Sequence, residues 1–130
     1  MHLDQGEHIT VSVSARQYWT NSSIDVKAGE QYALRALGTW EDGPKSCGPD
    51  GYECALLAPL QRMRRVPEAN WNSLIGSLDK RKESEFVIAT ATTLVCREPG
   101  RLYAFANDAP FMYWNNRGTL RLSITRLSDG

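Results

Sequence analysis

The chain has 130 residues, and 15 basic side chains balance 15 acidic ones, so its formal net charge is zero. This length fits a single domain over residues 1–130, and the balanced charge gives no general attraction to nucleic acid or to an anionic membrane. A hydrophobic content of 42% argues against disorder, and no apolar run approaches the roughly 18 residues of a membrane span.

The first eight residues lack the basic and apolar regions of a classical signal peptide. Three alternatives remain open on location. The protein is cytoplasmic, is exported without a classical signal, or is a domain excised from a larger chain.

Alternation of apolar and polar residues predicts β-strands along most of the chain. Ile9, Val11 and Val13 alternate with Thr and Ser, as expected of a half-buried strand. Residues 26–30 read as a strand end and turn. Further strands are predicted over residues 32–36, 74–78, 86–88, 93–96, 101–106 and 120–125, with a polar hairpin connection over 79–84.

Two segments are predicted to lie outside strands. Residues 38–51 are rich in Gly and Pro and read as loops. Residues 55–70 show leucines at helical spacing, but Pro59 and Pro67 limit any helix to a short turn.

Seven or eight short strands without a long helix predict an all-β fold, an antiparallel β-sandwich or barrel. The alternating positions predict its core: Val11, Val13, Leu34, Leu102, Ala104, Leu120, Leu122 and Ile124.

The three cysteines are Cys47, Cys54 and Cys96. An odd number excludes a complete framework of intramolecular disulfides. Cys47 and Cys54 lie close enough in sequence to pair in an oxidising compartment. In the alternative, all three are reduced thiols and Cys96 is buried as a small hydrophobic residue.

Basic residues cluster over 62–65 and again over 80–82. We expect the first cluster to be a solvated loop and the second a charged hairpin tip. Neither contains aromatic residues on which nucleotide bases could stack, so no nucleic-acid site is predicted.

The sequence contains none of the common catalytic motifs: no P-loop, dinucleotide fingerprint, nucleophile elbow or His-Glu-x-x-His. A small hydrolase with Asp108 as its base is the weakest reading, because no nucleophile or histidine partner accompanies that residue. We therefore expect a protein that is not an enzyme.

A long polar loop over residues 107–118 joins the two clearest strands. It exceeds the usual hairpin connection, and long loops often carry function. Asp108, Asn115 and Asn116 offer oxygen donors of the kind that Ca²⁺ prefers. Alternatively, these side chains only stabilise turns through local hydrogen bonds.

The chain also resembles the LecA-like (PA-IL-type) calcium-dependent galactose-binding bacterial lectins. The resemblance is carried by Asn107-Asp108-Ala109-Pro110 after a strand and by Asn115-Asn116-x-Gly118 before the last strand. Ala28-Gly29-Glu30, Gly38-Thr39-Trp40, Gly43-Pro44 and Leu74-Ile75-Gly76 follow the family's order.

The resemblance implies a jelly-roll-like, galactose-binding-domain-like β-sandwich with one Ca²⁺ in an end loop. It assigns the ion to the side chains of Asp108, Asn115 and Asn116 and to the backbone carbonyls of Met112 and Asp42. Sugar hydroxyls complete the calcium shell in the family.

The resemblance further implies that Asp108, Ala109 and Asn115 contact a galactose-type sugar. Trp114 and Phe111 stand where the family has small residues, and they either stack on a sugar face or block the site. The family's specificity loop carries a His and a Gln. Residues 52–63 contain no His, and neither of these sugar contacts is assigned to this chain, Gln61 included.

Two functions from different classes follow. The first is a calcium-dependent lectin module that binds a galactose-type glycan, with a homo-oligomer as one possible assembly. The second is a LecA-like accessory or interaction domain of a larger protein that has lost sugar binding.

Overall fold

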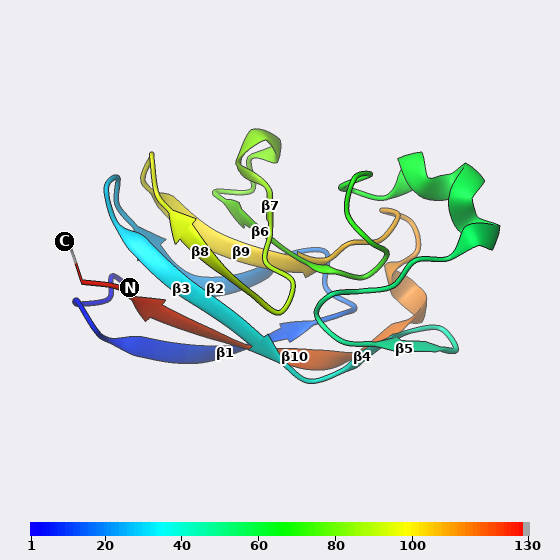
Figure 1. Ribbon diagram of the computed structural model, residues 1–130, viewed down its shortest axis with the longest axis horizontal. Helices are drawn as coiled ribbons and strands as arrows, with labels where there is room; N and C mark the ends of the chain where they lie inside the picture. Colours follow the sequence, from blue (N-terminus) through cyan, green and yellow to red (C-terminus); the bar gives the residue numbers. More distant parts are fainter. Residues whose placement is uncertain (129–130) are drawn as a thin grey trace.

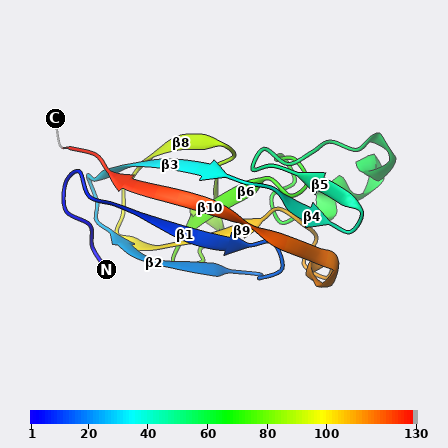
Figure 2. The same ribbon diagram turned by 90° about the horizontal axis from the view of Figure 1, so that it is seen from below.

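The computed structural model describes residues 1–128 and shows two antiparallel sheets packed as a β-sandwich (Figures 1 and 2), which confirms the predicted fold class. The strands are β1 (His8–Ser14), β2 (Thr20–Val26), β3 (Gln31–Leu37), β4 (Trp40–Asp42), β5 (Lys45–Cys47), β6 (Leu74–Leu78), β7 (Phe86–Val87), β8 (Ala91–Val95), β9 (Gly100–Ala106) and β10 (Asn116–Arg126). Three 3₁₀ helices accompany them: η1 (Ala55–Met63), η2 (Lys82–Ser84) and η3 (Tyr113–Asn115).

The long strand β10 organises the larger sheet. This sheet has the order β5-β4-β10-β3-β8, and β1 also pairs with β10. The first residues of β10 pair with β4, and its later residues lie between β3 and β1. The smaller sheet has the order β2-β9-β6-β7.

The core lies between the two sheets and largely matches the prediction. Val13, Leu34, Leu102, Ala104, Leu120, Leu122 and Ile124 are all buried. Val11 is the exception, because it is only half-buried at the margin of this cluster. Trp40, Tyr32 and Leu3 add large buried side chains to the core.

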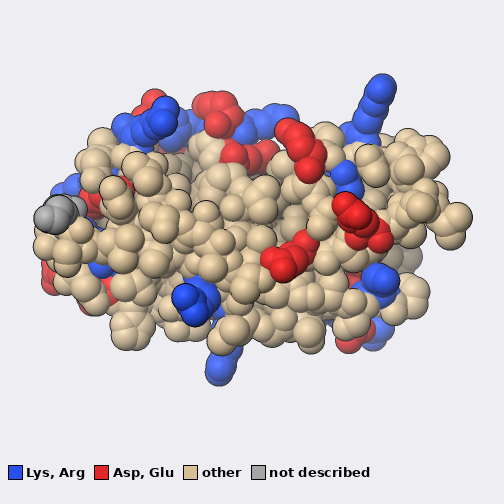
Figure 3. All heavy atoms as spheres, in the orientation of Figure 1, with Lys and Arg blue, Asp and Glu red and all other residues tan. Residues whose placement is uncertain are grey.

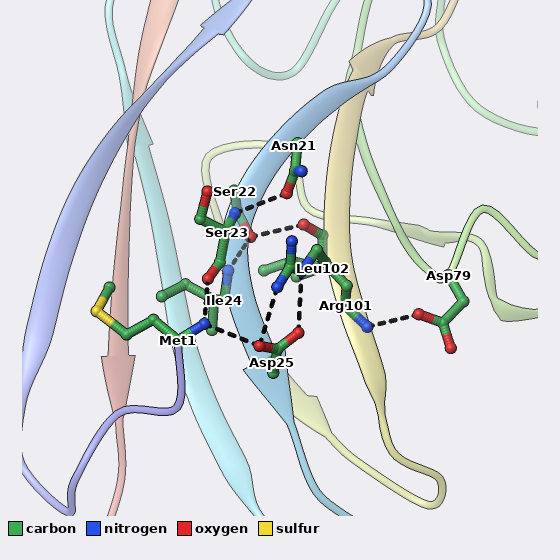
Figure 4. A network of polar contacts seen from close by, with 9 residues as sticks. All are labelled: Met1, Asn21, Ser22, Ser23, Ile24, Asp25, Asp79, Arg101 and Leu102. Atoms are coloured by element: carbon green, nitrogen blue, oxygen red, sulfur yellow. Dashed lines mark hydrogen bonds and ion pairs between the residues drawn. The ribbon is translucent and has the colours of Figure 1, made fainter.

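Strand β2 has polar as well as apolar residues among those that face inward. Thr20 and Ser22 are buried, and the Ser22 hydroxyl donates to the Leu102 carbonyl at 2.6 Å (Figure 4). A bulge separates the paired residues Asn21 and Asp25. Only its last residue, Val26, falls in the strand end predicted from the sequence.

The far side of the bulge is fixed by an ion pair between neighbouring strands. Both carboxylate oxygens of Asp25 accept hydrogen bonds from the Arg101 guanidinium, at 2.9 and 3.1 Å (Figure 4). The backbone N–H of Arg101 donates to Asp79. Arg101 thus ties β9 to β2 and to the turn after β6.

Two further predictions need correction. The Gly- and Pro-rich segment 38–51 is not only loop, because it contains the paired strands β4 and β5. The helix η1 runs for nine residues through Pro59 instead of stopping at a short turn. The fixed φ of proline lies within the range of a 3₁₀ helix. No helix among residues 1–128 is long and apolar enough to cross a membrane.

Candidate functional site

The long loop after β9 crosses from one sheet to the other. Strand β9 belongs to the smaller sheet and β10 to the larger one, so the predicted loop is a sheet-to-sheet connection and not an extended hairpin. It lies with η1 at the end of the sandwich far from residue 1 (Figure 1). Asn116 already pairs in β10, so the loop is shorter than the sequence indicated.

Strand pairing brings Asp42 to this loop. Asp42 and Asn116 are partners in the β4–β10 ladder, and the Gly43 N–H donates to the Asn115 carbonyl at 3.0 Å. Gly43 has φ +58, a left-handed conformation that suits glycine, and it allows the chain to turn from β4 into β5. Residues about seventy positions apart in the sequence thereby meet.

Asn107 anchors the start of the loop. Its side-chain oxygen accepts from the Val66 N–H, and its amide nitrogen donates to the carbonyls of Val66, Ala69 and Asn70. The side chain is fully buried and holds the segment 66–70 against the end of β9. Sequence reasoning noted this residue only as part of a motif and missed its structural role.

Asp108 is a buried carboxylate with one unused oxygen. Its Oδ1 accepts a hydrogen bond from the Ala109 N–H at 2.8 Å, whereas Oδ2 is buried without a partner in the described part of the chain. Burial, and secondarily the nearby Asp42, raise the pKa of Asp108 to about 6. At neutral pH the site therefore holds a desolvated negative charge, which a cation would stabilise.

Two amide oxygens share this lack of a partner. The Oδ1 atoms of Asn115 and Asn116 are buried, and neither accepts a hydrogen bond within residues 1–128. The Asn116 amide nitrogen donates to the Ala15 carbonyl at 3.0 Å, so its oxygen is the free end. Other buried polar atoms of the described residues, such as Ser77 Oγ, also lack partners, but here three oxygens of one loop do so together, and a cation bound by them would supply the missing interactions.

Most predicted site residues line one pocket of about 450 Å³. Asp42, Asp108, Ala109, Met112 and Asn115 all border it. Asn116 is fully buried and does not border the pocket. Trp114 is 66% exposed and is likewise absent from the lining, whereas its neighbour Phe111 is part of it.

The rest of the pocket wall is apolar and could not be read from the sequence. The wall consists of Leu56, Leu57, Leu60 and Met63 from η1, together with Trp71. No residue of η1 is buried, and Leu56 is 90% exposed. In Figure 3 the outermost part of this end is largely free of charged side chains.

Tyr52 is a second contributor that sequence reasoning missed. Its hydroxyl donates to Asp42 Oδ2 at 2.6 Å, and its backbone pairs with Trp71 in an isolated bridge. Burial raises the pKa of Tyr52 well above its usual value, so the phenol stays a donor. Tyr52 joins the carboxylate side of the pocket to its apolar wall.

The donor set restricts the kind of metal. No three carboxylate, histidine or cysteine side chains within residues 1–128 gather closely enough to hold an ion. The pocket offers two carboxylates with amide and carbonyl oxygens, a set that suits Ca²⁺ better than Zn²⁺. The residues present therefore fit the expected ion.

The cysteines do not join a metal-binding cluster within residues 1–128, although Cys54 borders the pocket. All three are free thiols, with Cys47 and Cys54 half-buried and Cys96 buried. The pairing of Cys47 with Cys54 that the sequence allowed is not formed. Burial raises the pKa of Cys96 to about 11, which keeps it an inert thiol.

Comparisons with known proteins support the fold. No protein-family model matches the chain, and no curated protein matches it. Among solved structures, it is similar to an "EclA N-terminal domain; PllA-like lectin", with a TM-score of 0.70 and 20% sequence identity. The match covers 90% of this chain and 94% of the other. The protein therefore has the β-sandwich fold of a lectin domain.

Proposed function

We propose that this protein is a calcium-dependent carbohydrate-binding module that takes a galactose-type sugar. One observation carries the proposal: Asp108 Oδ2, Asn115 Oδ1 and Asn116 Oδ1 are buried without partners at the end of one lectin-like sandwich. The alternative role of these side chains, local turn stabilisation, leaves those oxygens unexplained.

Asp108, Asn115 and Asn116 would hold the ion with their side chains, and Met112 and Asp42 with their backbone carbonyls. The Asp42 carboxylate already accepts from Tyr52, which favours the carbonyl as its ligand atom. When bound, calcium supplies a positive centre to which oxygen donors, including a pair of adjacent sugar hydroxyls, can coordinate.

The protein's own groups would orient the sugar. Asp108 and Asn115 can hydrogen-bond the same hydroxyls, with Ala109 beside them in the pocket lining. Phe111 borders the pocket and can cover an apolar sugar face, whereas the exposed Trp114 would act from outside it. We assign binding and no catalysis to this pocket.

A glycan array probed in calcium and again in chelator tests the function. We expect galactose-terminated glycans to bind only with calcium, and Asp108→Asn to abolish binding. Trp114→Ala separates the two roles of that ring, because weaker binding means stacking and tighter binding means occlusion. If neither the wild type nor Trp114→Ala binds any glycan in saturating calcium, the lectin assignment is wrong.

A single such site binds weakly. Without the family's His and Gln contacts, each lost neutral hydrogen bond removes about 1 kcal/mol, so a monosaccharide dissociation constant near the millimolar range is expected. Several copies in one assembly would provide avidity, and light scattering after size exclusion reports whether a homo-oligomer forms.

The exposed Leu56 of η1 favours a second candidate function, that of an accessory domain that binds another protein. Leu56 on the pocket rim is 90% exposed, and exposed apolar patches often mark protein contacts. An accessory domain that has lost sugar binding would use this surface. It would show no calcium-dependent glycan binding, and Leu56→Ser would weaken its protein contact.

A further inference from the structure

The two basic segments, residues 62–65 and 80–82, border one pocket although they lie apart in the chain. The pocket measures about 380 Å³ and is separate from the pocket that Asp108 and Asn115 border. Its aromatic lining comes from Tyr18 and Trp19. Its charged lining residues are Arg62, Arg64, Arg65, Lys80, Lys82 and Glu85. The first cluster is not the solvated loop expected from the sequence, because Arg64 and Arg65 are buried. The fold also places Tyr18 and Trp19 beside both clusters.

Arg65 is a buried cation without a carboxylate partner. Only 7% of the residue is exposed, and none of the ion pairs among residues 1–128 includes it. Its guanidinium donates to the Tyr18 carbonyl and the Tyr113 hydroxyl. Its central carbon lies 3.4 Å from the Phe105 ring centroid and 3.6 Å from that of Tyr18. The hydrogen-bond and ring partners of Arg65 are therefore neutral, and the nearby Glu85 carboxylate interacts with its charge only at longer range.

The pocket as a whole has excess positive charge. Five basic residues border it against one acidic residue, Glu85, with the Arg64 guanidinium set back over the Trp71 ring. Lys82 approaches Glu85 only to 3.9 Å, and the Lys82 side chain is 80% exposed. The local excess contrasts with the zero net charge of the chain and favours the approach of an anion.

The two pockets share a wall. Met63 borders both, and Ala109 borders the first where Pro110 borders the second. The Arg65 N–H donates to the Asp108 carbonyl at 3.1 Å. A ligand bound in the first pocket that extends past Met63 would therefore reach the pocket lined by the basic residues.

We propose that the pocket formed by Arg62, Arg64, Arg65, Lys80 and Lys82 is a second subsite, which binds the carboxylate or sulfate group of an acidic glycan. This inference rests on the proposed lectin function and specifies its ligand class. Carboxylate and sulfate share the chemistry that guanidinium and ammonium groups recognise, namely anionic oxygens that accept charge-assisted hydrogen bonds.

A glycan fits this pocket better than a nucleic acid does. Single-stranded nucleic acid needs open aromatic faces on which bases stack, but the Arg65 guanidinium lies over both Tyr18 and Trp19. The basic residues also border a single pocket. A single charged substituent matches this shape.

The test compares galactose with galactose 3-sulfate and galacturonate by titration calorimetry in calcium, at constant ionic strength. We expect at least one acidic sugar to bind about tenfold more tightly than galactose. The double variant Arg62→Gln/Lys82→Gln should lose this preference. The matched control, Arg35→Gln/Arg121→Gln, removes two exposed charges from β3 and β10 and should keep it.

Inorganic sulfate in chelator separates this inference from the proposed function. Saturable sulfate binding that the Arg62/Lys82 variant loses supports the subsite even without calcium. If galactose binds but no acidic sugar is preferred, or if the variant keeps the preference, the subsite is wrong and the lectin function stands. If sulfate binds but no sugar does, the lectin function fails and the glycan assignment with it. Tighter binding of a thymidine oligonucleotide, lost in the same variant, overturns the glycan in favour of nucleic acid.

Discussion

Asp42 and Asn116 face one another across the β4–β10 ladder, and this pairing joins two segments that each carry part of the candidate calcium site. Gly118, two residues further along β10, makes the approach possible. It has φ +91, and a Cβ atom there would lie 3.1 Å from the Trp40 Cα. The site geometry therefore depends on close contact between two backbones as much as on its polar side chains.

Asp108→Asn should act in opposite directions on stability with and without calcium. In chelator at neutral pH the variant should be more stable than the wild type, because it removes an ionised carboxylate that is buried near Asp42. In millimolar calcium the wild type should gain in melting temperature, as a folded-state ligand requires, and the variant should not. Thermal scans in both buffers check this. A wild type that gains nothing from calcium would exclude the metal site.

Leu122→Ala should lower the free energy of unfolding by about 2–5 kcal/mol, because a fully buried leucine leaves a cavity when it is truncated. Leu37→Ala is the matched control, since Leu37 is 64% exposed and its truncation should have little effect. Urea unfolding measures both. Equal losses would place Leu122 outside the core.

Gly51→Ala should be more destabilising than Gly29→Ala, although both residues have positive φ. A Cβ at Gly51 would lie 2.3 Å from the Trp71 carbonyl oxygen, whereas nothing lies within 4 Å of one at Gly29. Gly29→Ala should cost only the conformational strain of about 1–2 kcal/mol. The larger loss at Gly51 should also disturb the pocket, which Trp71 borders, and Trp fluorescence would report it.

Glu30 should make the protein acid-sensitive. Burial opposes its ionisation, but hydrogen bonds from the Tyr32 hydroxyl, the Lys27 N–H and His2 outweigh this and lower the pKa of Glu30 from 4.5 to about 2. A lowered carboxylate pKa stabilises the fold fully above pH 4.5, and that contribution is lost as the pH falls towards 2.

Urea unfolding across that pH window measures the effect. Glu30→Gln should be less stable than the wild type at neutral pH by about 1–3 kcal/mol, and the difference should shrink on acidification. Glu41→Gln, at a half-exposed side chain, should leave the pH profile unchanged. A constant gap between Glu30→Gln and the wild type would contradict the assignment.

The alternating strands could be predicted from the sequence, because one face of each packs on the core. Strand β2 could not, since Thr20 and Ser22 are buried polar residues whose hydroxyls donate to Gln17 and to Leu102 on β9. The oxygen-bearing loop was recognisable from its composition. Tyr52 and the leucines of η1 were not, because only the folded chain brings them to the pocket of Asp108.

The helix η1 forms one wall of the candidate sugar pocket without burying any of its own residues. Substitutions along it should therefore cost the sandwich little free energy while changing the surface that a ligand meets. Asn116, by contrast, lies in β10, which pairs with β1, β3 and β4. Selection, or a designer with a library confined to residues 55–63, could alter what the pocket accepts while the candidate ion ligands stay as they are.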